Sequence, residues 1–452
     1  TAGQSIGTLV SGGLISGDDV TITTTGAFSD ENVGTGKTVT LTSTYAGAQR
    51  NNYSITGQVS TTANITKLDV ALSGDTGLTK VYDATTSVTP ALTSPATGYG
   101  ALSVAAGYGA ALTADSAGLV ITGTPVFSSA NAGSVTVQQG SVLLTGTRAG
   151  NYNLVWTAPS ATITPAPLTI TANDDAKFYS QNDTAGYAGV RYSGFVGGQT
   201  STVLGGTLSV TRDRSVQLLA DANSVDTQDT AGSYASKLVP AGVTSNNYNI
   251  TFVNGNYTIV PVGQLLVKVA NTSAIYGSAP TYTLTAAGYM SSTTVGSVTT
   301  YQVTDLLGSN YATVSGAQVT VTDGSATVGS FTLGASNRVN STSGTLKVGS
   351  YSLGATAIST TSANFNNTIN VVGGYEVTPK SVTASATAVT KEYDGNTALG
   401  GYTLTPVGLV GADAVSLSGV GSYANKNVTG AANKTYTFTS LALSGADAAN
   451  YG

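Results

Sequence analysis

A phrase that recurs about every hundred residues constrains the fold of this chain more than any other feature. It is an Asn-Tyr or Asn-Phe pair, and in the first four copies a strand-like segment ends in Ile-Thr or a close variant eleven or twelve residues past the aromatic. The aromatics are spaced by 99, 96, 117 and 86 positions, and they are Tyr53, Tyr152, Tyr248, Phe365 and Tyr451. A period of this length predicts a tandem array of domains.

A second tyrosine keeps the same period. It follows the end of each strand-like segment by 16 or 17 residues. Tyrosines at fixed places at the two ends of a domain are typical of corner or core residues that tie strand ends together. We therefore interpret the repeated tyrosines as structural anchors: Tyr53, Tyr82, Tyr152, Tyr179, Tyr248, Tyr276, Tyr393 and Tyr451.

The two anchors divide the chain into five segments. Residues 67–165, 166–261 and 262–379 form complete repeats, residues 1–66 resemble the second part of a repeat, and residues 380–452 lack a closing strand. We therefore expect the chain to be a window cut from a longer array. Prolines stand at three of the joints, and because proline fixes φ and denies the helix, we expect short, extended, stiff linkers.

Hydrophobic residues alternate at period two along almost every segment, which predicts half-buried strands. In residues 37–42, for example, Val39 and Leu41 share one face and the threonines share the other. Turn residues separate such runs every eight to twelve positions, which indicates seven to nine strands per repeat. The predicted fold class is all-β, a tandem array of Ig-like β-sandwich repeats forming an elongated rod.

The composition excludes several classes of function. Only 9 % of residues are charged and the net charge is −5, so the chain has no basic surface for nucleic acid. No apolar stretch is long enough for membrane insertion. Histidine and cysteine are both absent, which removes the usual triads and thiol nucleophiles. We expect no enzyme activity and no cofactor.

The anchors resemble two repeat families of bacterial haemagglutinin-type exoproteins. Lys80-Val81-Tyr82-Asp83 and Lys391-Glu392-Tyr393-Asp394 are similar to the YDG repeat, as is the Asn-Tyr phrase. On these motifs residues 1–66, 67–165 and 380–452 resemble YDG repeats. Residues 166–261 resemble an MBG repeat through 192–198 and 254–259, and residues 262–379 do so more loosely through 276–282.

This resemblance implies a large adhesin, secreted or held at the bacterial cell surface and often exported by two-partner secretion. Such proteins support cell–cell or cell–matrix adhesion and biofilm formation in the extracellular matrix. Our leading hypothesis is a non-enzymatic stalk whose partners are exopolysaccharide, neighbouring cell surfaces or like chains. Two alternatives stay open, namely polymerisation into an extracellular fibre and polysaccharide binding by the repeats, for which the candidates outside the anchors are Tyr99, Tyr108, Tyr187 and Tyr192.

Charged residues offer two further candidate chemistries. Asp174-Asp175 and the loop with Asp221, Asp226 and Asp229 could bind Ca²⁺, but no calcium-loop pattern supplies the six to eight oxygen ligands needed. We therefore interpret them as solvated turn carboxylates. Lys80 and Lys391 each lie near an aspartate, and we interpret these pairs as surface salt bridges rather than isopeptide bonds.

Overall fold

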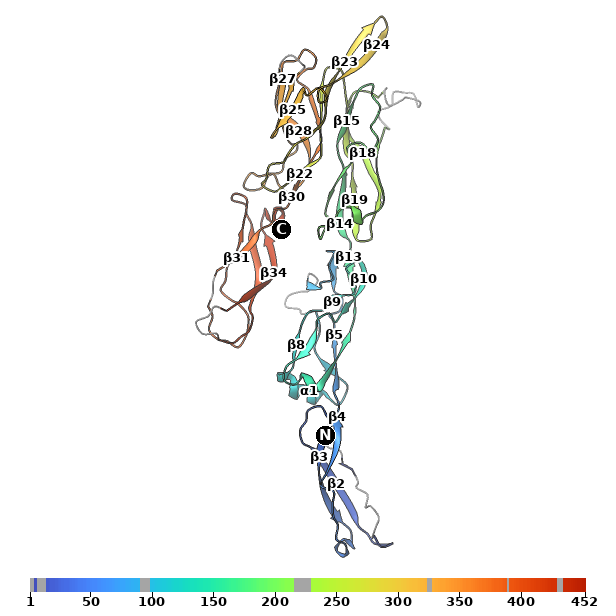
Figure 1. Cartoon of the computed structure of the whole chain (residues 1–452), viewed down its shortest axis with the longest axis vertical. Coiled ribbons are helices and arrows are strands. Elements are labelled where there is room, and N and C mark those ends of the chain that lie inside the picture. The colour runs from blue at the N-terminus through green and yellow to red at the C-terminus, as the bar shows by residue number, and fades with distance from the viewer. Residues whose placement is uncertain are drawn as a thin grey trace. The chain divides into compact units, whose positions relative to one another are not determined.

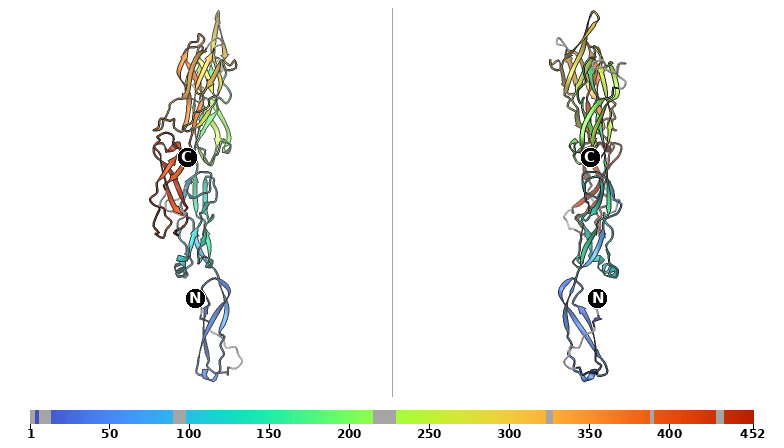
Figure 2. Two further views of the ribbon diagram at one scale, coloured as in Figure 1. Left: turned by 60° about the vertical axis from the view of Figure 1, so that its left-hand side comes forward. Right: turned by 90° about the vertical axis from the view of Figure 1, so that its right-hand side faces the viewer.

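The computed structural model describes residues 4–5, 14–89, 98–214, 229–322, 327–387, 390–428 and 434–452, and it is nearly all β (Figure 1). The chain divides into two compact units. One consists of Thr1–Ala166 with Asn246–Tyr248, and the other of Pro167–Ser245 with Asn249–Gly452. Each unit contains several of the repeats seen in the sequence. Two further views show strands running along the length of each repeat (Figure 2).

The first repeat is an antiparallel sheet in chain order. Its elements are β1 (Gln4–Ser5), β2 (Thr21–Phe28), β3 (Gly34–Ala46), the 3-10 turn η1 (Arg50–Asn52) and β4 (Ser60–Ile65). Exposure alternates along β2 and β3, with Val39 buried and Thr40 exposed. The period-two pattern of the sequence is therefore a real alternation between the two faces of this sheet.

The second repeat has two principal layers, because its first and last strands each break and continue in a second sheet. One sheet has the order β12-β5-β7, the other β6-β13-β10-β9, and β8 pairs with β11. The pairings β5–β12 and β6–β13 are parallel. The elements are β5 (Leu68–Ser73), β6 (Thr79–Val81), β7 (Ser103–Val104), α1 (Gly109–Asp115), η3 (Ser116–Gly118), β8 (Val120–Thr122), β9 (Val126–Phe127), β10 (Gly133–Gln138), β11 (Leu143–Thr145), η4 (Ala149–Asn151), β12 (Tyr152–Thr157) and β13 (Ser160–Thr164).

The third repeat repeats this plan. Its sheets have the orders β16-β14-β19 and β15-β20-β18-β17, and β15 runs parallel to β20. The elements are β14 (Ala166–Ala172), β15 (Asp175–Phe178), β16 (Val190–Ser193), η5 (Ser201–Val203), β17 (Gly205–Arg212), β18 (Gly232–Thr244), β19 (Tyr248–Val253) and β20 (Gly255–Val260).

The fourth repeat is larger, and its core cluster also includes Tyr451 of the fifth repeat. Leu265, Tyr276, Val319 and Phe331 are among its fully buried residues. The sheets are β24-β23-β21-β29 and β22-β30-β28-β27-β26-β25. The elements are β21 (Leu265–Val269), β22 (Thr272–Ile275), β23 (Leu284–Val295), β24 (Val298–Asp305), β25 (Ala312–Ser315), β26 (Gln318–Thr322), β27 (Thr327–Ala335), β28 (Gly349–Thr360), β29 (Ile369–Val372) and β30 (Gly374–Thr378).

The fifth repeat contains two antiparallel strand pairs, β31–β32 and β33–β34. A single parallel bridge joins Lys380 to Tyr451, at the place where β5 meets β12 in the second repeat. The elements are β31 (Thr383–Ala386), β32 (Leu404–Val407), β33 (Ser416–Tyr423), β34 (Tyr436–Ser444) and η7 (Ala448–Asn450).

The joint between the third and fourth repeats does not continue end to end, in contrast to the extended linker predicted from Pro261. Gly263, with φ +77°, lies in a turn there. After the turn, the chain of the fourth repeat runs antiparallel to β15 of the third repeat, so that residues further along β21 contact residues nearer the start of β15. Phe178 packs with Leu266, Asp175 pairs with Lys268 at 2.7 Å, and the Ala188 carbonyl accepts a hydrogen bond from Asn271. These two repeats therefore lie side by side.

Candidate functional site: the joints between repeats

The asparagine side chain of the recurring phrase forms a hydrogen bond with a turn of the preceding repeat. The Oδ1 atoms of Asn151, Asn247 and Asn450 accept hydrogen bonds from the backbone N–H of Val33, Ala132 and Val348, at 2.9, 2.8 and 3.0 Å. Each amide lies just before a glycine that begins the next strand of that turn. One side chain therefore makes the same contact at the first–second, second–third and fourth–fifth joints.

At two of these joints the amide nitrogen completes the contact. Asn151 Nδ2 donates to Asn32 Oδ1 and Asn247 Nδ2 donates to Asn131 Oδ1, both at 3.1 Å. We call this pair of bonds the asparagine clasp. At the fourth–fifth joint Lys347 occupies the position of the partner asparagine. There, Asn450 Nδ2 is buried without a hydrogen-bond partner in the described part of the chain.

A glycine and a 3-10 turn precede the Asn-Tyr phrase in each of the YDG-like repeats. The turns η1, η4 and η7 end on the asparagine, and Gly47, Gly146 and Gly445 precede them with φ of +114°, +107° and +111°. A Cβ atom on these glycines would lie only 2.2, 2.3 and 2.4 Å from a backbone carbonyl oxygen. Only glycine suits this conformation and this approach. The equal spacing of these glycines before Asn-Tyr could have identified them in the sequence.

The tyrosine of the phrase binds an aspartate of its own repeat. The hydroxyls of Tyr53, Tyr152 and Tyr451 donate to Asp18, Asp115 and Asp413 at 2.6, 3.0 and 2.6 Å. Tyr152, Tyr248 and Tyr451 are buried, whereas Tyr53 is half-buried. Burial, together with the neighbouring carboxylate, raises the pKa of Tyr152 and Tyr451. These hydroxyls therefore act as donors within the fold.

The second tyrosine anchor meets the first anchor of the following repeat. The rings of Tyr82 and Tyr248 pack edge to face at 5.4 Å, as do those of Tyr276 and Tyr451. The parallel pairing of β6 with β13 explains why these rings meet. The Tyr82 N–H donates a hydrogen bond to the Thr164 carbonyl at 2.8 Å, which places Tyr82 at the end of the repeat where the chain leaves it. The sequence placed these residues in phase but gave no sign that they touch.

The anchors Tyr179 and Tyr393, and Phe365 of the fourth phrase, differ from this arrangement. Tyr179 packs against Tyr301 of the β23–β24 hairpin at 5.3 Å, and Phe365 packs against Tyr289 at 5.5 Å. Tyr393 is 60 % exposed, in contrast to the core position expected of an anchor.

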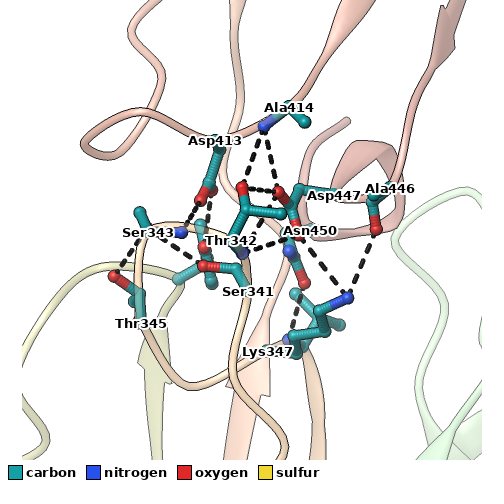
Figure 3. Close-up of polar contacts among 12 residues, drawn as sticks. Ser341, Thr342, Ser343, Thr345, Lys347, Asp413, Ala414, Ala446, Asp447 and Asn450 are labelled. Carbon is teal, nitrogen blue, oxygen red and sulfur yellow. Dashed lines mark hydrogen bonds and ion pairs between the residues drawn. The ribbon is translucent and has the colours of Figure 1, made fainter.

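The fourth–fifth joint gathers two carboxylates around a serine and threonine loop (Figure 3). Asp413 accepts hydrogen bonds from the Tyr276 and Tyr451 hydroxyls, both at 2.6 Å, and from the Ser343 N–H at 3.3 Å. Burial alone would raise the pKa of Asp413, but these hydrogen bonds outweigh it and hold the pKa well below the usual range. Asp413 is therefore an ionised acceptor shared by two repeats.

Asp447 has the same role on the other side of this loop. It accepts hydrogen bonds from the Thr342 hydroxyl and from the Ala414 N–H, the latter at 3.0 Å, and lies 3.5 Å from Lys347 Nζ. The Thr342 hydrogen bond is the main reason that the pKa of Asp447 is lowered. Because Thr342 and Lys347 belong to the fourth repeat and Asp447 to the fifth, the carboxylate joins the two.

The lysine before each second anchor is held inside its repeat. Lys80 Nζ binds Asp83 Oδ1 at 2.7 Å and the carbonyls of Thr85 and Ser87 at 2.6 and 2.9 Å, with its side chain 1 % exposed. Lys80 therefore forms the predicted salt bridge with Asp83, but the prediction that it lies on the surface is wrong, because the loop covers the ammonium group. Lys391 binds Asp394 at 2.8 Å in a more open copy of the same loop.

The acidic residues proposed as solvated turn carboxylates are instead paired. Asp229 is buried and binds Lys177, Arg212 and Arg214, whereas Asp221 and Asp226 lie outside the described residues. Asp175 is buried and binds Lys268. Asp174 accepts a hydrogen bond from the Asn256 N–H at 2.7 Å. In the described ranges no group of three acidic residues could hold a metal ion.

The four tyrosines proposed outside the anchors are scattered. Tyr187 bonds Asp183 at 3.0 Å and packs on Tyr257. Tyr108 is 54 % exposed beside α1, and Tyr99 makes an isolated bridge with Gly74. Tyr192 lies beside Phe195, with ring centres 5.4 Å apart. Tyr192 borders a cavity of about 710 Å³.

The fold and the joints define an all-β protein of tandem repeats held together by recurring polar and aromatic contacts. The family model of the YDG domain matches residues 1–63, 66–162 and 378–452, together more than half of the chain. The chain therefore belongs to the YDG domain family. The model of the MBG domain (YGX type) matches residues 168–258. A comparison with curated proteins found no match.

Among the described residues, no helix is both long and apolar enough to cross a bilayer.

Proposed function

We propose that this chain is a non-enzymatic structural segment of a bacterial adhesin, secreted or held at the cell surface, whose repeats act as a stalk. The observation on which the proposal depends is the recurrence of one joint. The asparagine contact at three joints and the tyrosine pair at two of them connect neighbouring repeats through side chains that are largely buried. A stalk needs such joints, because flexible linkers would let each repeat rotate freely and would not hold the orientation of one repeat relative to the next.

The family membership supports the same proposal, since YDG and MBG domains are repeat domains of adhesin-like proteins. Export by two-partner secretion, a place in the extracellular matrix and a part in biofilm formation belong to the proposal as well. The low charge fits this role, because hydroxyl and amide surfaces stay hydrated with little dependence on salt. Absence of cysteine suits a chain that passes unfolded through an oxidising compartment.

The test removes the clasp at two joints. We expect the double variant Asn151→Ala with Asn247→Ala to broaden the distribution of intramolecular distances in small-angle X-ray scattering. Each substitution removes two hydrogen bonds, worth about 1 kcal/mol apiece. The matched control is Asn153→Ala, which removes a bond to Asp69 within one repeat.

The control variant should leave the scattering profile unchanged. A wild-type chain whose profile already fits freely jointed domains would contradict the stalk. An unchanged profile in the double variant would show that the clasp does not set the joint.

A further inference from the structure

Two cavities follow the seam between the third and fourth repeats. The larger has a volume of about 710 Å³ and the smaller about 460 Å³, and both are bordered by Arg191, Val348 and Gly349. Ligand pockets are commonly about 300–1,000 Å³. We call the two cavities together the seam cleft, and the residues of the larger one that the argument uses are Arg191, Tyr192, Phe195, Asn271, Ser273 and Glu376.

Arg191 borders both cavities with unused hydrogen-bonding capacity. It lies on β16, and its Nη1 donates to Asn173 Oδ1 at 3.1 Å. Its Nε is buried and has no hydrogen-bond partner, and no described acidic residue forms an ion pair with it. Buried polar atoms in native proteins almost always have a partner, so the Arg191 Nε is an exception, while the residue itself lines both cavities.

Glu376 supplies the opposite chemistry in the larger cavity. It lies on β30, with Ser273 and Ser350 as its register neighbours on the flanking strands. It is half-buried and accepts no hydrogen bond from any side chain or amide that the structure describes. Burial raises the pKa of Glu376 and lowers that of Arg191, as expected for two desolvated charges without direct partners.

The cleft also offers an aromatic surface. Tyr192 and Phe195 are half-buried, their tilted rings lie 5.4 Å apart, and both residues line the larger cavity. Asn271 and Ser273 also line the larger cavity, and the Asn271 amide is held by the Ala188 carbonyl and the Gly374 N–H. Aromatic faces cover the apolar face of a sugar ring, while fixed donors and acceptors satisfy its hydroxyls, which both donate and accept.

We propose that the seam cleft binds a neutral oligosaccharide. The guanidinium of Arg191 donates to ring hydroxyls, the carboxylate of Glu376 accepts from them, and the Tyr192–Phe195 pair covers one face of a sugar. The two charges offset each other, so the cleft favours a ligand without net charge. The second cavity shares Arg191 with the first, which favours a ligand of several sugar units over a single one.

The test uses the whole chain and isothermal titration with maltotetraose, cellotetraose and mannotetraose. We expect at least one of these neutral tetrasaccharides to bind. Tetragalacturonate and a glucosamine tetrasaccharide, which are anionic and cationic, should bind at least roughly tenfold more weakly, because each meets a like charge in the cleft.

Two variants assign the binding to the cleft. Arg191→Met and Glu376→Gln should each weaken binding by roughly tenfold or more, the usual effect of losing hydrogen bonds to a charged group. The matched controls are Arg50→Met and Glu392→Gln, which lie in the first and fifth repeats away from the cleft. Circular dichroism confirms folding, and Glu376→Gln keeps the side-chain shape.

Failure of all three neutral tetrasaccharides to bind would overturn the proposal. Binding that survives both variants, or tighter binding of a charged tetrasaccharide, would overturn it too. The stalk is independent of this outcome, because its own test measures the asparagine clasp and not the cleft.

Discussion

Gly146 is constrained by the backbone of its own repeat. With φ at +107° and a neighbouring carbonyl oxygen 2.3 Å from the place of a Cβ atom, alanine forces the turn before η4 to open. We expect Gly146→Ala to destabilise the second repeat by about 2 kcal/mol. Trp156 is the only tryptophan and belongs to this repeat, so a urea titration followed by its fluorescence measures this repeat alone.

Gly150→Ala is the matched control for Gly146→Ala. Gly150 lies in η4, with φ outside the left-handed region and open space where its Cβ would be. Its urea midpoint should stay close to that of the wild type. Equal midpoints for both variants would show that the turn tolerates a side chain at position 146.

Asp413 makes the fourth–fifth joint dependent on pH in a defined direction. Its folded pKa lies below the value of about 3.9 for a free aspartate, so its contribution is complete above that pH and is lost as the pH falls through the folded pKa. The pKa of Asp447 is lowered as well. We therefore expect the joint to remain closed at pH 5 and to weaken only below about pH 4.

Paired fluorophores can follow this joint, because the chain has no native cysteine. Val339→Cys and Val428→Cys place labels on exposed residues of the two repeats, and energy transfer between them should stay constant from pH 7 to pH 5. Asp413→Asn should lengthen the separation at neutral pH, since three hydrogen bonds lose a charged acceptor. Asp305→Asn, which bonds only its own turn, should not. Opening of the wild-type joint already at pH 6 would disprove this role for Asp413.

At the scale of the element, the pairing of first and last strands explains why the two anchors lie where they do. β6 runs parallel to β13, which brings Tyr82 beside Thr164, where the chain leaves the repeat. Lys380 bridges Tyr451 in parallel, which places the first anchor where the chain enters a repeat. Tyrosines 166 or more positions apart in the sequence thus meet at one joint.

Many of the strands could be predicted from the sequence, because a half-buried strand shows alternating apolar and polar residues over a short stretch. Alternation identified β3, and turn residues separated most strands. Contacts such as Asn151 with Asn32 could not be predicted, although Asn32 and Asn131 lie 99 positions apart and so follow the period, because the contacts depend on which ends of the repeats meet. The burial of Lys80 was missed for a similar reason, because a lysine in a turn gives no local indication that the loop closes over it.

At the scale of the whole molecule, the third and fourth repeats are joined by a mixed apolar cluster. Phe178 and Val260 come from the third repeat, and Leu266, Met290 and Val372 come from the fourth. Period and linker composition alone predicted an extended joint here, since they contain no information about the side faces of repeats. Gly263 allows the turn, and the cluster stabilises the packing that follows it.

Met290 reports on this packing directly, because it is the only methionine and is 1 % exposed. If the repeats stay side by side, peroxide should oxidise Met290 at least about tenfold more slowly in the folded chain than in urea, as measured by mass spectrometry. Phe178→Ala removes a buried ring from the cluster and should raise the folded-state rate several-fold. Phe252→Ala, at an exposed position of the same repeat, should leave it unchanged. Equal rates in the folded and unfolded chains would mean that the two repeats separate freely, and the seam cleft would then have no fixed shape to offer a ligand.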